Sequence, residues 1–317
     1  MSVLITAPYN EEGLSEIASM FGEVCYRPWK TNGSAFTATK LIELLQEAKA
    51  TALITEHDHV TREVIEAFPK LQFIGVCRGT PSNLDLEAAK EKGIAVFYTP
   101  ARNAQAVVEL LIANVITLLR KTLPAIDWLE SGKWEAGAHT SYLQFKGSEL
   151  AGKTVGLVGF GAIGRKLANI LKEFPCTICY YDPYYTDANK AYQKVDLEAL
   201  FTKSDIISIH LPNNKETEKM IDRHLIGLMS KDAIFVNTAR AAVVDRQALL
   251  EAIKNGQIRG AVLDVFDQEP PDAIDYQLIR HPHVLATPHI AGASFEVEDH
   301  HVRIMNDQLK KWYNAKA

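Results

Sequence analysis

Residues 155–182 read VGLVGFGAIGRKLANILKEFPCTICYYD, and this stretch decides the fold of the chain. The apolar run from Val155 to Val158 predicts a buried parallel strand, which ends in the glycine pattern GFGAIG directly before a helical pattern. A second apolar run, 177–181, ends at Asp182, 18 residues after Gly164. The spacing in a dinucleotide-binding fingerprint is roughly 20 residues. The stretch therefore predicts a strand–turn–helix–strand unit that binds a dinucleotide.

The three glycines have separate physical roles in such a turn. Gly159 permits the tight turn, Gly161 lets the backbone approach a pyrophosphate, and Gly164 lets the helix pack closely on the strand. The following helix begins near Ala162 and Ile163, and its first amides and positive dipole end face the phosphates. The alternative is a glycine-rich turn in another kind of α/β protein.

Asp182 predicts which dinucleotide binds. Its carboxylate can accept hydrogen bonds from the ribose hydroxyls, and its charge would repel a 2′-phosphate. We therefore expect NAD rather than NADP as the cofactor.

The bulk composition excludes several classes of protein. At 317 residues the chain is long enough for two domains, and its net charge of −5 offers no basic surface for nucleic acid. The N-terminus lacks the pattern of a signal peptide, and polar residues interrupt the apolar stretch 104–119, so we expect no membrane span. Cys176 and Cys179 form a CxxC pair with no second pair to complete a zinc site, so we expect structural cysteines, no metal and a cytoplasmic location.

Strand and helix patterns alternate along the chain, which predicts parallel sheets with helices on both faces. The expected strands are 3–6, 23–26, 52–56, 73–77, 94–98, 206–210, 234–237, 262–265 and 284–286. The expected helices are 12–20, 40–48, 63–68, 86–91, 103–119 and 296–312, with an irregular segment around 128–145. We expect an α/β fold of two Rossmann-like, doubly wound domains. The NAD-binding domain, 102–291, is inserted in a flavodoxin-like substrate domain, 1–101 and 292–317.

Polar residues follow the expected strands of the second domain, where a doubly wound sheet binds its ligands. They are Asp182, His210-Leu211-Pro212, Asn237-Thr238-Ala239-Arg240, Asp264 with Glu269, and Thr287-Pro288-His289. Five such strand ends indicate a lined cleft.

These blocks resemble the D-isomer specific 2-hydroxyacid dehydrogenase family, and the resemblance covers nearly the whole chain. Its other motifs are GVCRGTPSNLDLEAAKEKGIAVFYTPARNAQAVVEL, IISIHLPNNKET, FVNTARAAVVD, GAVLDVFDQEP and TPHIAG. The resemblance implies that Arg240, Glu269 and His289 carry the reaction, and that the chain is similar to phosphoglycerate dehydrogenases.

The residue types suit the transfer of a hydride from C2 of a hydroxy acid. His289 is the natural acid–base group, and Glu269 would orient its ring and stabilise the imidazolium. Arg240 would hold the substrate carboxylate and polarise the carbonyl oxygen. Each residue has an alternative without catalysis. Arg240 could be a surface arginine, Glu269 an acid in a proline-rich turn, and His289 a histidine whose hydrogen bonds are satisfied beside a proline.

The resemblance also implies cofactor contacts beyond the fingerprint, at His210, Leu211, Pro212, Thr238 and Asp264. His210 is expected at the adenosine end of the cofactor. Asp264 would contact the nicotinamide amide, hold the surroundings of the catalytic histidine, or be purely structural.

Arg78 and Arg102 depart from the family pattern, as does Ala241, which replaces a usual glycine. Arg78 stands where a substrate-binding loop usually has glycine, while Gly79 and Thr80 still offer amides to a substrate carboxylate. We hypothesise that the two arginines bind a second anionic group on the substrate. The alternative is that they pair with surface acids.

The predicted function is NAD-dependent interconversion of a small D-2-hydroxy acid and its 2-keto acid. The preferred substrate is a phosphorylated sugar acid such as 3-phosphoglycerate, in an enzyme of the short form without a regulatory domain. The enzymatic alternative is glyoxylate or hydroxypyruvate reduction. The alternative of another class is an NADH-sensing corepressor, while formate dehydrogenase is disfavoured because Glu269 stands where that group has glutamine. The apolar helix 104–119 and the segment with Trp128 and Trp134 also predict a homodimer.

Overall fold

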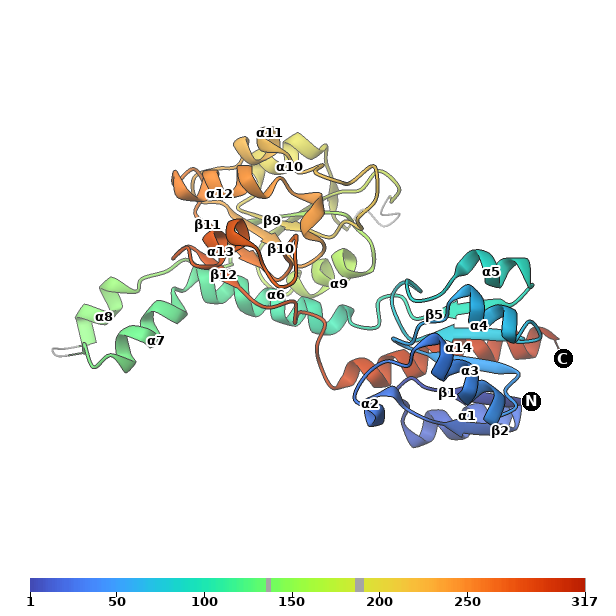
Figure 1. The fold of residues 1–317 in the computed structure, drawn as a ribbon. Coiled ribbons are helices and arrows are strands. Elements are labelled where there is room, and N and C mark those ends of the chain that lie inside the picture. Colours follow the sequence, from blue (N-terminus) through green and yellow to red (C-terminus); the bar gives the residue numbers. More distant parts are fainter. Residues whose placement is uncertain (135–137, 186–190, 317) are drawn as a thin grey trace. The chain divides into compact units, whose positions relative to one another are not determined.

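The computed structural model describes residues 1–134, 138–185 and 191–316, and the chain in it divides into two compact units. Unit 1 comprises Met1–Asn103 with Ser294–Ala317, and unit 2 comprises Ala104–Ala293. Each unit is built around its own parallel sheet (Figure 1).

The sheet of unit 1 has five parallel strands in the order β2-β1-β3-β4-β5, which is the flavodoxin-like order. The strands are β1 (Ser2–Ile5), β2 (Glu23–Tyr26), β3 (Ala52–Thr55), β4 (Phe73–Val76) and β5 (Ala95–Tyr98). β1, β3 and β4 are buried throughout, as continuous apolar strands covered on both faces must be.

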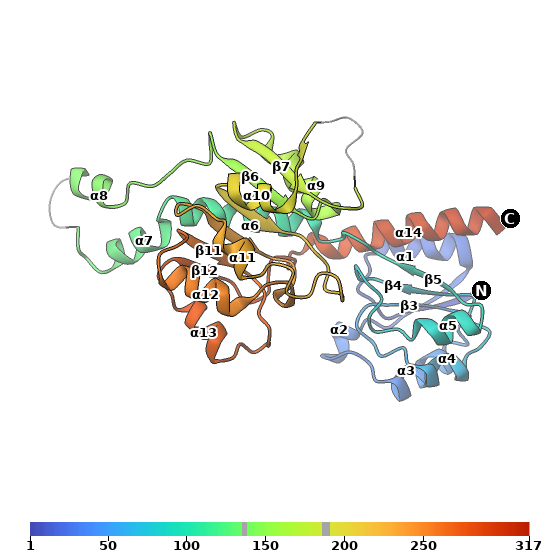
Figure 2. The ribbon, with the colours of Figure 1, turned by 90° about the horizontal axis from the view of Figure 1, so that it is seen from above.

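Helices cover both faces of this sheet (Figure 2). One face carries α3 (Ala38–Glu47), α4 (Arg62–Ala67) and α5 (Leu86–Glu91). The other carries α1 (Glu11–Phe21) and the last helix, α14 (Glu296–Lys316). Met305 and Leu309 of α14 are fully buried in a cluster that includes Val3 and Phe73, so both ends of the chain share one core.

The sheet of unit 2 has seven parallel strands in the order β12-β11-β10-β9-β6-β7-β8. The strands are β6 (Thr154–Val158), β7 (Thr177–Tyr181), β8 (Gln193–Lys194), β9 (Ile206–Ile209), β10 (Ile234–Asn237), β11 (Gly260–Leu263) and β12 (Val284–Ala286). The chain order reverses between β6 and β9, so the ligand crevice of such a sheet is expected beyond their carboxyl ends.

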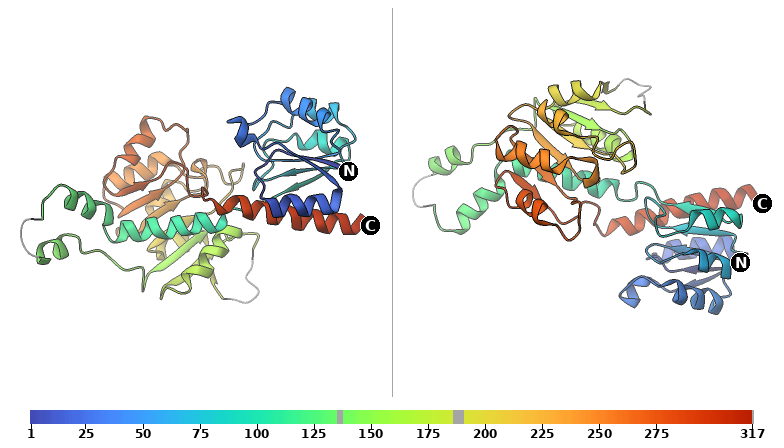
Figure 3. Two further views of the ribbon diagram at one scale, coloured as in Figure 1. Left: turned by 90° about the horizontal axis from the view of Figure 1, so that it is seen from below. Right: turned by 45° about the horizontal axis from the view of Figure 1, so that its top comes forward.

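Helices also cover both faces of the second sheet (Figure 3). One face carries α6 (Ala104–Leu119) and α9 (Ala162–Leu171). The other carries α10 (Leu197–Lys203), α11 (Arg223–Gly227), α12 (Arg246–Lys254) and α13 (Ala273–Ile279). Side chains of Asp222, Asp245 and Asp272 each accept an amide hydrogen bond at the start of the helix that follows them.

These two parallel-sheet units confirm the predicted fold class, but the local prediction was wrong in one segment. The part around 128–145 was expected to be irregular, whereas α7 (Thr122–Glu130) and α8 (Ala138–Gln144) occupy most of it. The sequence also missed the short helix α2 (Trp29–Asn32), the short strand β8, the four helices α10 to α13 and the 3-10 turn Ala241–Val243.

All four cysteines are free thiols; Cys176 lies directly before β7, and Cys179 lies within it. No described helix is both long and apolar enough to cross a lipid bilayer. The residues described also contain no group of three or more His, Cys, Asp or Glu side chains suited to a metal ion.

Candidate active site and cofactor site

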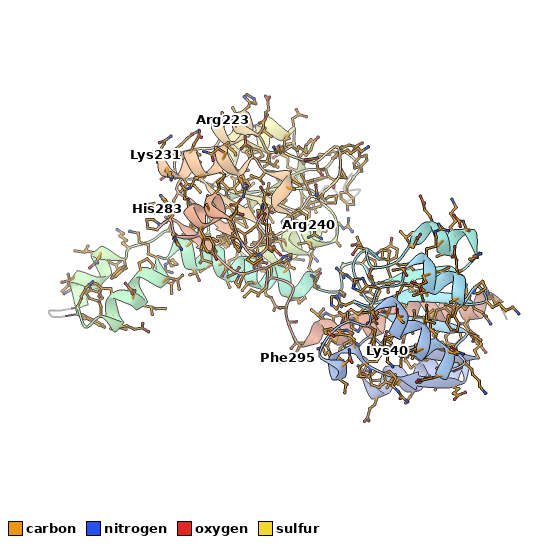
Figure 4. All side chains as sticks on the ribbon, viewed as in Figure 1. Lys40, Arg223, Lys231, Arg240, His283 and Phe295 are labelled. Carbon is orange, nitrogen blue, oxygen red and sulfur yellow. The ribbon has the colours of Figure 1, made fainter. Side chains whose placement is uncertain are left out.

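The candidate catalytic residues of unit 2 follow neighbouring strands at one edge of the sheet. Asn237 at the end of β10 pairs with Leu263 of β11, which pairs with Ala286 of β12. Since parallel strands end at the same edge, the segments that carry Arg240, Glu269 and His289 all leave the sheet there. Figure 4 labels Arg240 in this unit.

Glu269 and His289 are in direct contact. His289 Nδ1 lies 2.8 Å from Oε1 and 2.9 Å from Oε2 of Glu269. The side chains are 50% and 45% exposed, so the pair is open to a ligand. Because a carboxylate only accepts hydrogen bonds, Nδ1 carries the hydrogen and Nε2 is left for another partner.

Asp264 holds the loop that carries the histidine. Its buried carboxylate accepts hydrogen bonds from the Thr287 hydroxyl at 2.6 Å, from Ile290 N at 2.9 Å and from Ala291 N at 2.8 Å. His289 itself has φ 53°, in the left-handed region that few non-glycine residues adopt. Such a conformation persists only where its surroundings fix it, and these hydrogen bonds fix both sides of the residue.

Arg240 does not join the Glu269–His289 pair. Its Nη1 donates to Ala239 O at 2.6 Å, and no ion pair or hydrogen bond to that pair is present among the described residues. Asn237 shapes this turn, since its side chain donates to Arg240 O and accepts from Ala239 N. The guanidinium is exposed, so it can meet an anionic ligand.

The fingerprint turn has the shape that a dinucleotide needs. Gly159 has φ 93°, and Gly161 lies at the N-terminus of α9, where a Cβ would meet no atom within 4 Å. A Cβ on Gly164 would lie 2.4 Å from Gly159 O, so helix and turn are as close as glycine allows. The amides of Ala162 and Ile163 open α9 and have no partner within it, as the first amides of a helix never do. This open cradle with its amides fits a pyrophosphate.

Asp182 is already engaged with the backbone. One oxygen accepts from Phe160 N at 2.8 Å, and the other accepts from Tyr184 N at 2.8 Å and Tyr185 N at 3.0 Å. A carboxylate accepts about four hydrogen bonds, so about one remains for a ribose hydroxyl. The residue therefore shapes the turn and keeps about one acceptor position that a ribose hydroxyl would fit.

The ends of β9 and β10 supply the remaining candidate cofactor residues. His210 lies against the fingerprint turn, because a Cβ on Gly159 would be 2.7 Å from its carbonyl oxygen. Burial lowers the pKa of His210 to about 4, so its ring is neutral at neutral pH. Leu211 is buried and Pro212 O accepts from Thr217 Oγ1.

Thr238 Oγ1 is buried with no hydrogen-bond partner in the described part of the chain. An orphaned buried hydroxyl at a strand end is the kind of group that a bound ligand satisfies.

Unit 1 has a polar cluster at the corresponding edge of its sheet. Arg102 pairs with buried Glu56 at 2.5 Å, and Trp29 Nε1 donates to the same carboxylate at 2.9 Å. Burial raises the pKa of Glu56, but the arginine and the tryptophan N–H outweigh it, so the net pKa is lowered and the carboxylate is ionised. Arg78 Nη1 lies 3.2 Å from His57 Nδ1, where burial lowers the imidazole pKa.

The rest of this cluster comes from α14. Buried His301 lies 3.0 Å from Arg102 Nη1 through Nδ1 and 2.7 Å from Pro8 O through Nε2. Arg102 thus has an internal acid and an imidazole as partners, rather than the surface acids that the sequence alternative named. Gly79 keeps open space around its Cα.

The sequence missed Glu56, His57 and His301. A usable signal existed for the first two, since they directly follow β3 as polar residues, the pattern that identified the candidates of unit 2. His301 had no such signal, because it lies on a helix far along the chain.

Gly164, which is tightly packed, and Gly161, which lies in open space, give a matched pair of substitutions. Gly164→Ala should lower the free energy of unfolding by roughly 1–3 kcal/mol, because its Cβ would overlap Gly159 O. Gly161→Ala should leave stability unchanged but weaken NADH binding, because its methyl group would occupy the cradle. Urea unfolding and NADH fluorescence titration check both. Equal stability of the two variants would contradict the packing argument.

Comparison with known proteins identifies the family. The family model described as D-isomer specific 2-hydroxyacid dehydrogenase, NAD binding domain, matches residues 112–291. A Bacillus subtilis protein, YoaD, whose name classes it among the 2-hydroxyacid dehydrogenases, is 54% identical over 100% of this chain and 92% of its own length. A glyoxylate reductase of Thermococcus litoralis is 36% identical over 94% of this chain and 89% of its own.

Two further similarities bear on fold and length. A D-3-phosphoglycerate dehydrogenase of Methanocaldococcus jannaschii is 35% identical over 98% of this chain, which spans 57% of that protein. The solved structure of an acyclic imino acid reductase with NADPH and D-Arg is 27% identical, covers 100% of this chain and 98% of that one, and has a TM-score of 0.81. The chain belongs to the D-isomer specific 2-hydroxyacid dehydrogenase family, whose members are NAD-dependent oxidoreductases.

Proposed function

We propose that Glu269 and His289 form the proton-transfer pair of an enzyme that interconverts a small D-2-hydroxy acid and its 2-keto acid. The observation that carries this proposal is the 2.8 Å contact between Glu269 and His289 Nδ1, which leaves Nε2, on the other side of the ring, for a different partner. In the reductive direction Nε2–H donates a proton to the C2 oxygen, and in the oxidative direction Nε2 accepts it. The negative charge of Glu269 stabilises the protonated ring.

Arg240 and the cofactor residues complete the proposed site. The Arg240 guanidinium binds the substrate carboxylate and stabilises the C2 oxygen as charge develops. Bound NAD would supply the hydride chemistry at C2, in the direction set by whether its oxidised or reduced form is present. The amides at the start of α9 hold its pyrophosphate, Thr238 Oγ1 offers a hydrogen bond, and Asp182 favours NAD through its charge.

For the substrate we propose a short hydroxy acid with a second anionic group, such as 3-phosphoglycerate. The amides of Gly79 and Thr80 would bind its carboxylate, and Arg78 would bind the second anion. The phosphoglycerate dehydrogenase relative supports this class. Glyoxylate or hydroxypyruvate is the second candidate, because Glu56 neutralises Arg102 and leaves the cluster with less positive charge than the sequence suggests.

A homodimer is also part of the proposal. α7 and α8 extend away from the rest of unit 2 in all three ribbon views (Figures 1–3). Large apolar side chains on these helices and between them are 45–71% exposed: Leu123, Ile126, Leu129, Trp134, Tyr142 and Leu143. A second copy of the chain would cover this surface.

The proton-transfer pair can be tested by following NADH oxidation with a panel of 2-keto acids. His289→Asn should lower kcat/KM roughly 10²–10⁴-fold. Reduction needs the protonated ring, so activity falls as pH rises. Glu269→Gln removes the charge that favours this proton and should move that fall to lower pH. Tight NADH binding without turnover of any acid would instead support the NADH-sensing binding protein.

The second-anion site can be tested with Arg78→Ala. We expect KM to rise for phosphohydroxypyruvate much more than for glyoxylate, because the lost cation faces a group that glyoxylate lacks. Arg62→Ala is the matched control, since Arg62 is an exposed arginine of the same unit that pairs with Glu91. An equal loss for both acids would rule out a second-anion role for Arg78.

The dimer can be tested by sedimentation velocity at micromolar concentration. Wild-type protein should sediment as a dimer and the double variant Leu129→Asp/Leu143→Asp as a monomer, because charges would replace the apolar contact. Leu86→Asp, a similarly exposed leucine of unit 1, is the control and should stay dimeric. Monomeric wild-type protein would contradict the proposal.

A further inference from the structure

The loop that carries Glu269 is tied at both ends to one guanidinium. Arg246 Nε lies 2.8 Å from Asp267, two residues before Glu269, and its Nη1 lies 2.8 Å from Asp272, three residues after it. The same Nη1 lies 3.1 Å from Asp275 in the first turn of α13. One side chain at the start of α12 therefore closes the loop 267–272 into a ring.

Little else holds this loop in place. From Asp267 through Pro271, all described, no backbone amide donates a hydrogen bond to a backbone carbonyl. Pro270 and Pro271 have no amide hydrogen to donate. Beside the loop lies a largely apolar cavity of about 360 Å³ whose lining includes Glu269, Pro270, Pro271 and Tyr276. Neither backbone pairing nor dense packing therefore fixes the Glu269 backbone, and two restraints remain among the described residues: the contact of the Glu269 side chain with His289 and the ion pairs of Arg246 at the two ends of the loop.

The charges around Arg246 distinguish its ion pairs from those of an exposed surface residue. Three carboxylates surround one guanidinium, and the Asp275 side chain is only 3% exposed. Burial raises the pKa of Asp275, which shows how poorly this position tolerates a charge. Asp272 also caps α13 through its other oxygen, which accepts from Ile274 N and Asp275 N. Without Arg246 the three acids would repel one another, and the two ends of the loop would separate.

We propose that Arg246 is a positioning residue that holds Glu269 against His289. It touches neither residue, and it acts by fixing the two ends of the intervening loop. The inference rests on the proposed role of Glu269 in proton transfer. The catalytic pair then has two separate supports, since Asp264 holds the histidine loop and Arg246 holds the glutamate loop.

Arg246→Gln keeps much of the side-chain length and removes the charge. We expect kcat/KM in the reductive direction to fall roughly 10- to 100-fold, as expected for a misplacement of about 1 Å. The fall in activity at high pH should move to lower pH, in the direction expected for Glu269→Gln. Arg246→Lys should restore activity only in part, because the single charged nitrogen of lysine cannot lie close to Asp267 and Asp272 at once as Nε and Nη1 of the guanidinium do. If Arg246→Gln fails to fold, Asp267→Asn removes the ion pair at one end of the loop and should move the pH profile in the same direction by a smaller amount.

A double-mutant cycle separates positioning from general stabilisation. If Arg246 acts through Glu269, the double variant Arg246→Gln/Glu269→Gln should be no less active than Glu269→Gln alone. Arg223→Gln is the matched control, because the exposed Arg223 pairs with Glu251 of the same helix α12 (Figure 4) and should leave activity and pH dependence unchanged. Additive losses, or a lower melting temperature with an unchanged pH profile, would overturn the proposal.

The same measurements keep the two proposals distinguishable. If the His289→Asn variant is as active as the wild type, the proposed function itself is refuted. Activity that depends on His289 and Glu269 but not on Arg246 would refute only the positioning role.

Discussion

Three parallel strands of unit 2 end together because their residues pair in one register, Asn237 with Leu263 and Leu263 with Ala286. This pairing brings loops that are far apart in the sequence to a common edge. A slip of one residue would turn every side chain of a strand to the opposite face and move its loop along the edge. The contact between Glu269 and His289 has no local origin and depends on that register.

Much of the fold could be predicted because buried parallel strands are short, continuous apolar runs. The expected and observed bounds agree at β2, β10 and β12 and differ by one or two residues at most others. β11 begins two residues earlier than expected because it starts at Gly260, and glycine disfavours a strand prediction. The structure shows why glycine is needed there, since a Cβ would lie 2.1 Å from His283 O.

What could not be predicted depends on contacts between distant residues. Motifs identified Glu269 and His289 as candidates, but no spacing in the sequence says that they touch. The sequence left open whether Arg102 binds a ligand or pairs with a surface acid, and the buried acid that it contacts lies 46 residues earlier, directly after β3. Arg246 gave no signal at all, because its role depends on three aspartates that the fold brings to it.

The three amides bound by Asp182 also constrain how this chain could evolve. In a fold where the ribose acid points freely into solvent, one substitution there could change the coenzyme that is used. Here the same substitution would also remove the hydrogen bond that holds the backbone at Phe160. A change of coenzyme at this position would therefore also disturb the turn. A variant of this chain that keeps the turn intact would therefore change its coenzyme preference at positions that neighbour the aspartate.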